Sequence, residues 1–182
     1  MGLSCGRHGT CAVYFDDGDS GDIVRENVFI RCGNRPRSPG EKPWGVKADV
    51  IMPAATQNDV KMESAEKIVA NGVKYYIEVA NMPTTNDALN FLRAQKNMIV
   101  APSKAVNAGG VGVSALEMAQ NAERLVWTAE EVDTQLHRMM ENIVKVSEEA
   151  AAEYGLGYDL VAGANIAGFK KVAQAMLEQG LF

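Results

Sequence analysis

The sequence predicts an α/β fold, in which an open parallel sheet of about three strands with flanking helices precedes a helical carboxy-terminal region. Three short apolar runs begin near residues 50, 75 and 99, about 25 residues apart. Helical patterns lie between them, and strands that alternate with helices form parallel sheets through βαβ crossovers. After the third run, apolar residues repeat at intervals of three and four residues, which is the period of an α-helix.

Each predicted strand is followed by signals for a helix. The strands are expected within residues 46–53, 74–79 and 97–101. The helix after the first strand ends at Asn71-Gly72, because glycine favours a helix stop. The helix after the second strand carries Leu89 and Leu92. Together these elements make up the predicted sheet layer.

Three helices are predicted after the sheet. The first spans about 113–125. The second begins at Thr128, which forms a capping-box signal with Glu131. The third extends over about 164–179 and is stopped by Gly180. The last two helices carry apolar stripes that we expect to pack in the core: Val132, Leu136, Met139, Ile143 and Val146, and then Ile166, Phe169, Val172, Ala173 and Met176.

The composition of the chain changes near Pro39. Residues 1–38 are rich in Gly, Arg, Asp and Cys and show little apolar periodicity, apart from a weak strand at 27–30. Pro36 and Pro39 give the junction the character of a linker, because proline fixes φ and biases the preceding residue away from helix. We therefore predict an unassigned, irregular segment over 1–38 and a folded domain over 39–182.

Composition argues against several classes of protein. The net charge of -5 disfavours nucleic-acid binding, which needs a basic face. No apolar run approaches the roughly 20 residues that cross a bilayer, and the first residues lack the apolar core of a secretory signal. We therefore expect no membrane partner and a cytoplasmic location. Cys5, His8 and Cys11 lack a second ligand pair at a zinc-site spacing, so no metal site is predicted.

Asparagines mark the loops that follow the predicted strands. Ligands of an open parallel sheet bind beyond the carboxyl ends of its strands, and the three loops there contain Asn58, Asn81 and Asn107. A carboxamide donates and accepts hydrogen bonds, so it matches a nicotinamide amide or ribose hydroxyls without adding charge. The simpler interpretation is that asparagine is common in loops, and that Asn58 or Thr84 caps the following helix. Three asparagines in corresponding places favour a ligand.

The third loop is also the densest glycine site of the regular region. The run Asn107-Ala108-Gly109-Gly110-Val111 permits close approach of a ligand, or simply a turn with positive φ. Ser114 is then a helix cap or a substrate contact, and Lys104 is solvated or paired with a ligand. The pattern Gly110-x-Gly112-x-x-Ala115 fits the loose dinucleotide fingerprint, but its glycines lie well beyond the third strand, so we reject it.

Four stretches of the sequence are distinctive: PWGVKADVIMPAATQND, IEVANMPTT, APSKAVNAGGVGVSALEMAQNAERLVW and LVAGANIAGFKKVAQAMLEQG. They closely resemble the carboxy-terminal region of bacterial, hexameric glutamate dehydrogenases, within the glutamate, leucine, phenylalanine and valine dehydrogenase superfamily. The clostridial NAD-dependent type looks nearest. The likeness extends from about Pro39 to Phe182 and implies part of a Rossmann-like nucleotide-binding domain.

The resemblance implies roles for individual residues. Binding of the cofactor NAD, with NADP not excluded, is implied for Ala54, Ala55, Thr56, Asn58, Asn81 and Asn107. Contacts with the substrate are implied for Gly110, Val111 and Ser114, with the Ser114 hydroxyl near the side-chain carboxylate of glutamate. Relatives that act on branched-chain or aromatic amino acids look apolar at that serine position. An apolar pocket would leave a buried carboxylate unpaired, so Ser114 favours glutamate.

The implied reaction is the NAD(P)-dependent oxidative deamination of L-glutamate to 2-oxoglutarate and ammonia by a homohexamer. In the family, a nicotinamide accepts hydride from the α-carbon and water attacks the resulting imine, while a lysine and an aspartate transfer protons. Neither of these acid–base motifs occurs here, and no glycine-rich phosphate turn precedes Trp44. We therefore expect no catalytic residue in this chain and no activity from it alone.

The sequence departs from the family pattern in three places. Ala54 stands where many members have cysteine, Ala115 replaces a frequent glycine, and residues 1–38 stand where the substrate-binding domain and the front of the nucleotide-binding domain belong. One alternative is a non-catalytic nucleotide-binding or interaction module, and another is a shifted reading frame or wrong start upstream of an enzyme gene. A half-sheet would also expose an edge and an apolar face, which predicts poor solubility.

Overall fold

The computed structural model describes residues 42–45 and 47–180. The chain divides into two compact units, 1–45 and 46–182. In the described part of the first unit, Pro43–Gly45 forms a short 3-10 helix that contains the buried Trp44. The weak strand predicted at 27–30 and the cysteine and histidine residues near the amino terminus lie outside the described residues.

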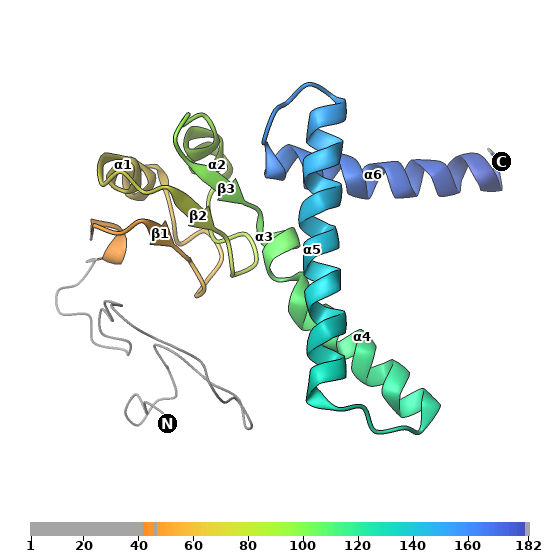
Figure 1. The fold of residues 1–182 in the computed structure, drawn as a ribbon. Coiled ribbons are helices and arrows are strands. Elements are labelled where there is room, and N and C mark those ends of the chain that lie inside the picture. The colour runs from red at the N-terminus through yellow and green to blue at the C-terminus, as the bar shows by residue number, and fades with distance from the viewer. Residues whose placement is uncertain (1–41, 46, 181–182) are drawn as a thin grey trace, which may run out of the picture. The chain divides into compact units, whose positions relative to one another are not determined.

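The second unit contains a sheet of three parallel strands. The strands are β1 (Val50–Ile51), β2 (Tyr75–Ile77) and β3 (Ile99–Ala101), in the order β1-β2-β3 (Figure 1). Each lies within the stretch that the sequence predicts for it, although each is shorter. The predicted α/β fold with about three parallel strands is confirmed.

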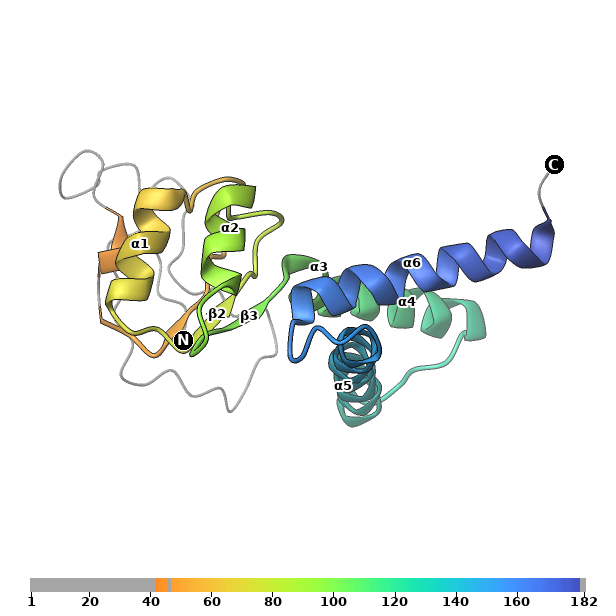
Figure 2. The same ribbon diagram turned by 90° about the horizontal axis from the view of Figure 1, so that it is seen from above.

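Two helices, α1 (Met62–Ala70) and α2 (Asn86–Arg93), cover one face of the sheet. Figure 2 shows them side by side, as expected because right-handed crossovers place consecutive helices of a βαβαβ unit on the same face. Side chains alternate across a strand, so every second residue points towards these helices. The buried residues of this layer include Ile51, Tyr76 and Val100 on the strands, and Ala65, Ile68, Ala88 and Leu92 on the helices.

The opposite face of the sheet carries a row of exposed apolar side chains. Val50 pairs in register with Tyr75, and Tyr75 with Ile99. These three residues are 46%, 44% and 36% exposed, whereas parallel sheets are ordinarily buried on both faces. The predicted exposure of an apolar sheet face is therefore confirmed, and the poor solubility expected from it stays a prediction.

Four helices follow the sheet: α3 (Ser103–Val106), α4 (Ala108–Glu123), α5 (Ala129–Glu153) and α6 (Leu160–Gln179). Helix α4 lies against the amino-terminal half of the long α5, and α6 crosses the carboxy-terminal half (Figure 1). The capping box at the start of α5 is confirmed: Glu131 N–H donates to Thr128 Oγ1 at 3.2 Å, and Thr128 N–H donates to Glu131 Oε2 at 2.6 Å. None of the described helices is long and apolar enough to cross a membrane.

Two of these helices begin earlier than the sequence predicts. The helix expected over 113–125 begins at Ala108, because the glycine run is helical instead of forming a loop. The helix expected over 164–179 begins at Leu160, because the Asp159 carboxylate accepts the Ala162 N–H at 3.0 Å and caps the extra turn. Gly180, with a φ of 82°, ends α6 as predicted.

The two predicted apolar stripes differ in burial. The stripe on α5 is half-buried throughout. On α6 the predicted core role is wrong, because Phe169, Val172 and Met176 are 70%, 59% and 55% exposed. The physical reason is the crossing geometry: the first turns of α6, with Leu160 and Val161, are buried, and the helix then extends away from α5 (Figure 1).

Candidate functional site

The loops that follow β1 and β2 are joined by main-chain hydrogen bonds beyond the carboxyl ends of the strands. The Val79 N–H donates to the Pro53 carbonyl at 3.1 Å, and the Asn58 N–H donates to the Met82 carbonyl at 2.9 Å. The first two predicted asparagine loops therefore lie side by side at the edge where an open parallel sheet binds its ligands.

The third loop meets the second through a pair of asparagine side chains. Asn107 lies between α3 and α4, and its Nδ2 donates to Asn81 Oδ1 at 2.6 Å and to the Val79 carbonyl at 3.3 Å. Among the described residues, Asn81 Nδ2 has no acceptor and Asn107 Oδ1 has no donor. Two of the three predicted asparagines therefore form one hydrogen-bonded pair, and within residues 42–45 and 47–180 the pair has one donor and one acceptor left for a ligand.

The side chain of Asn58 is not part of the Asn81–Asn107 pair. Its φ of 55° places it in a turn, a conformation that asparagine adopts more readily than most residues. The interpretation of Asn58 as a helix cap is wrong, because α1 is capped at Lys61. The Asn58 side chain instead lines a cavity of about 850 Å³, which residues of the β2 loop, α2, α3 and α6 complete. The neighbouring predicted residues Ala54, Ala55 and Thr56 are exposed on the same loop.

The same cavity is lined by an acidic residue that the sequence prediction missed. Glu78 directly follows β2 and is only 3% exposed, and its Oε2 accepts the Ser103 N–H at 3.3 Å. Burial of a carboxylate is unfavourable unless it has hydrogen-bonding partners. The signal was present in the sequence: Glu78 is a lone charged residue inside the apolar run YYIEVA.

Two other predicted candidates have structural partners. The Thr84 hydroxyl is buried and lies 2.7 Å from the Tyr76 hydroxyl, and Thr85, not Thr84, caps α2. Burial raises the pKa of Tyr76 well above its ordinary value of 10.0, and the hydrogen bond with Thr84 opposes that rise. The Lys104 Nζ donates to Asn165 Oδ1, which connects α3 with α6. Thr84 therefore has a place in the core, and Lys104 joins two helices.

The predicted substrate residues lie on the exposed side of α4. Gly110, Val111 and Ser114 are all exposed, and a β-carbon on Gly110 would meet no atom within 4 Å. The Ser114 hydroxyl donates to the Gly110 carbonyl at 3.2 Å, one helical turn earlier. In contrast, a β-carbon on Gly112 would overlap the sulfur of Met139 in α5. The glycine run therefore serves helix packing on one side and leaves an open surface on the other.

The structure supports the rejection of the dinucleotide fingerprint. Gly110, Gly112 and Ala115 all lie inside α4, whereas a true fingerprint occupies a tight turn between a strand and a helix. The alternative of a positive-φ turn is also wrong, because neither Gly109 nor Gly110 has a positive φ.

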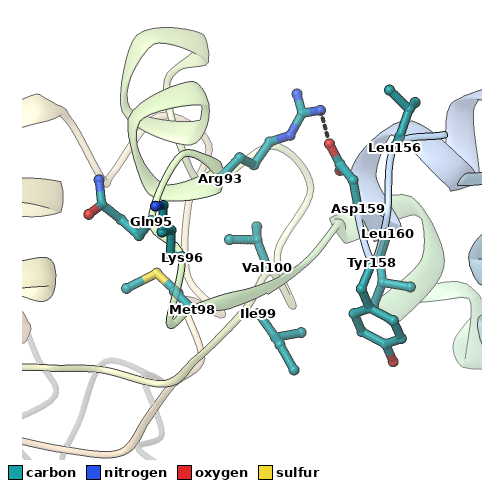
Figure 3. A pocket seen from close by; sticks show the side chains of 10 residues that line it. All are labelled: Arg93, Gln95, Lys96, Met98, Ile99, Val100, Leu156, Tyr158, Asp159 and Leu160. Carbon is teal, nitrogen blue, oxygen red and sulfur yellow. Dashed lines mark hydrogen bonds and ion pairs between the residues drawn. The ribbon is translucent and has the colours of Figure 1, made fainter.

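A second cavity, of about 330 Å³, lies at the opposite end of β3 (Figure 3). There the Arg93 Nη2 at the end of α2 donates to the Asp159 Oδ2 before α6 at 2.6 Å, and both side chains are 28% exposed. Partial burial raises the pKa of Asp159, but hydrogen bonds from Arg93 and from the Ala162 N–H outweigh it and hold the pKa below its ordinary value of 3.8. This ion pair connects the sheet layer with α6, away from the asparagine pair.

The described residues combine an open parallel sheet, helices on one face, and amide side chains at the carboxyl ends of the strands. This combination defines part of a Rossmann-like α/β domain together with its ligand-binding edge. Within residues 42–45 and 47–180, no group of three or more His, Cys, Asp or Glu side chains is arranged to hold a metal ion.

The chain belongs to the Glutamate/Leucine/Phenylalanine/Valine dehydrogenase family, whose model matches residues 23–180. It is 71% identical over 143 residues to the NAD-specific glutamate dehydrogenase of Clostridium symbiosum, covering 79% of this chain and 32% of that protein. It is 49% identical over 144 residues to the NADP-specific glutamate dehydrogenase of Haemophilus influenzae, covering 79% and 32%. A solved glutamate dehydrogenase structure matches with a TM-score of 0.76 and 70% identity, over 79% of this chain and 32% of that one.

The chain spans about a third of the length of the curated relatives it matches. The family match begins at residue 23, so it includes part of the segment 1–38 that we predicted to lie outside the family. The domain boundary near Pro39 stays a prediction.

Proposed function

We propose that this chain forms the nicotinamide-side wall of an NAD(P)-dependent glutamate dehydrogenase site. The observation that carries the proposal is the hydrogen bond from Asn107 Nδ2 to Asn81 Oδ1. Because this bond uses the Asn107 amide nitrogen and the Asn81 oxygen, the Asn81 Nδ2 is left to donate and the Asn107 Oδ1 is left to accept. A primary carboxamide such as that of nicotinamide offers the complementary acceptor and donor.

The other predicted residues extend this wall in two directions. Ala54, Ala55, Thr56 and Asn58 supply the adjoining loop on the cofactor side, and Gly110, Val111 and Ser114 supply the substrate side. When bound, NAD or NADP supplies the hydride acceptor, and this chain's residues hold and orient its carboxamide. NAD is the first candidate because the relative at 71% identity is NAD-specific, and NADP is a second because an NADP-specific relative is 49% identical.

The proposed substrate is L-glutamate, with 2-oxoglutarate and ammonia as products of oxidative deamination. Ser114 supports a carboxylate ligand: its hydroxyl is exposed and its only bond among the described residues is the one to the Gly110 carbonyl. Rotation of that hydroxyl would exchange a neutral hydrogen bond for one to a charged oxygen, which is roughly twice as strong. The whole protein is proposed to act in the cytoplasm as a homohexamer, as the family resemblance implies.

Titration of the isotopically labelled chain with nicotinamide mononucleotide, followed by NMR, tests the nicotinamide-side wall. The side-chain amide signals of Asn81 and Asn107 should move on binding, and Asn107→Ala should weaken the affinity by about tenfold, as expected when a hydrogen bond to the ligand is lost. Asn97→Ala is the matched control, because Asn97 is an exposed asparagine before β3, at the opposite edge of the sheet. Equal affinities for wild type and Asn107→Ala would contradict the proposal.

An absorbance assay at the nicotinamide wavelength tests the activity of the chain itself. We expect the 182-residue chain not to oxidise glutamate with NAD, since the acid–base motifs of the family do not occur in it. Binding without turnover is also what a non-catalytic nucleotide-binding module would show. A shift of the Ser114 amide on addition of 2-oxoglutarate favours the dehydrogenase, and its absence favours the module.

A further inference from the structure

The one-turn helix α3 is fixed at both ends by the segment that follows β2. At its start, the Ser103 N–H donates to Glu78 Oε2 at 3.3 Å. At its end, Asn107 Nδ2 donates to Asn81 Oδ1 and to the Val79 carbonyl. Three hydrogen bonds therefore connect this helix with three residues of the segment 78–81: Glu78, Val79 and Asn81.

Ser103 and Asn107 are coupled through the helix itself. The Asn107 N–H donates to the Ser103 carbonyl at 2.9 Å, so the two residues are the ends of one helical turn. A turn closed in this way moves as a unit, because its φ and ψ angles are fixed together. A displacement of Ser103 is therefore transmitted to the Asn107 side chain.

Glu78 is the side chain that holds the start of this turn. Its main-chain N–H donates to the Ala101 carbonyl at 3.0 Å, which extends the pairing of β2 with β3 by one residue. The side chain then reaches the Ser103 N–H from a position that is 3% exposed. A buried acceptor oxygen is unfavourable unless it has a donor, so this hydrogen bond holds the Glu78 side chain and the Ser103 N–H together.

We propose that Glu78 is a positioning residue of the nicotinamide-side wall. By accepting the Ser103 N–H, its carboxylate fixes α3 and thereby holds the Asn107 side chain in hydrogen-bonding position to Asn81. Glu78 acts on the ligand only through this pair. The consequence for nicotinamide binding rests on the proposed function, whereas the effect on Asn107 is a property of the free protein.

The test measures hydrogen exchange of the Asn107 side-chain amide by NMR, with no ligand present. In wild type this exchange should be slower than that of the exposed Asn97 amide. In Glu78→Ala it should become about fivefold to tenfold faster, the change expected when one hydrogen bond is lost. Glu78→Gln keeps the volume and one acceptor oxygen, so it should stay within about twofold of wild type. Glu66→Ala is the matched control, because Glu66 is exposed on α1.

A second variant removes the donor and leaves the carboxylate in place. Ser103→Pro deletes the N–H at the first position of α3, where proline is well tolerated. The preceding Pro102, with a φ of -75° and a ψ of 147°, already has the conformation that a following proline requires. Ser103→Pro should therefore accelerate Asn107 exchange as Glu78→Ala does, and it decides the question if Glu78→Ala does not fold.

The outcomes separate this proposal from the proposed function. Unchanged Asn107 exchange in both folded variants, or in Ser103→Pro alone if Glu78→Ala is unfolded, would overturn the positioning role. Faster exchange supports it even if nicotinamide mononucleotide binds nowhere on the chain, a result that would overturn the proposed function alone. If both proposals hold, the two variants weaken nicotinamide mononucleotide binding by the same factor by which they accelerate exchange.

Discussion

Gly163 of α6 lies directly against the main chain of Ser147 in α5. A β-carbon on Gly163 would lie 2.7 Å from the Ser147 carbonyl carbon, would overlap the carbonyl oxygen, and would lie 3.2 Å from the Ala151 side chain. The Ser147 hydroxyl donates to the Ile143 carbonyl at 2.7 Å, so it is satisfied within its own helix. The crossing of α5 and α6 therefore depends on the missing side chain of Gly163.

We expect Gly163→Ala to destabilise the chain by about 1–3 kcal/mol or more, the usual cost of overpacking a tight contact. The neighbour is main chain, which cannot move aside as a flexible side chain does. Gly168→Ala is the matched control on the same helix, where a β-carbon would meet no atom within 4 Å. That variant should be neutral or more stable by up to about 1 kcal/mol, because alanine favours helix. Urea denaturation measures both, and equal midpoints would contradict the packing argument.

The sequence predicted correctly those elements that depend on residues close to them in the chain. The strands, the capping box at Thr128 and the stop at Gly180 follow from residues within one or two turns. The pairing of Asn81 with Asn107 was also accessible, because parallel strands bring the loops at their carboxyl ends to one edge of the sheet. The roles assigned to the site residues stay predictions.

Features that depend on contacts between residues far apart in the sequence were missed. The glycine run at the start of α4 suggested a loop, and only the approach of α5 to Gly112 shows why a helix contains it. The pairing of Arg93 with Asp159 joins residues 66 positions apart, and no spacing rule connects them. The α6 stripe has the pattern of a core helix, but a pattern does not show what covers it, and Phe169 is exposed. In each case the outcome depends on how the helices and strands pack in space, which a local sequence pattern does not show.

The buried hydroxyl pair of Tyr76 and Thr84 should show strong coupling. Their oxygens lie 2.7 Å apart and link β2 with the residue before the cap of α2. Tyr76→Phe or Thr84→Val alone leaves one buried hydroxyl unsatisfied, at a cost of about 1–3 kcal/mol, whereas the double variant removes both groups. In a double-mutant cycle of urea unfolding, the double variant should lose clearly less than the sum of the single losses. Additive losses would show that the two hydroxyls act independently.

The capping box at the start of α5 should contribute measurably to stability. Thr128→Ala removes the side-chain acceptor for the Glu131 N–H, and loss of an N-cap of this kind costs about 1 kcal/mol. Thr134→Ala changes an exposed threonine inside the same helix and should be neutral or slightly stabilising, since alanine has the higher helix propensity. Thermal unfolding followed by circular dichroism measures both variants. The capping assignment fails if Thr134→Ala lowers the Tm as much as Thr128→Ala does.

The ion pair of Arg93 and Asp159 should give the chain an acid-sensitive component of stability. Asp159→Asn keeps the cap of α6, because asparagine caps helices about as well as aspartate, and it removes the charge that Arg93 contacts. For a pair that is partly exposed, the loss near neutral pH should be about 1 kcal/mol. Asp133→Asn is the control, since its pairing with His137 on α5 is long, at 3.8 Å, and highly exposed.

The sign of the pH dependence follows from the lowered pKa of Asp159. A carboxyl group whose pKa is lower in the folded state binds fewer protons there than in the unfolded chain, so its stabilisation is present above the ordinary value of 3.8. It is lost as the pH falls through the lower, folded value, where Arg93 no longer faces a charge. Urea unfolding should therefore show a constant gap between wild type and Asp159→Asn from pH 7 to about pH 5, and the gap should close in acid. A gap that persists undiminished in acid would mean that the loss comes from the cap or from packing, not from the charge.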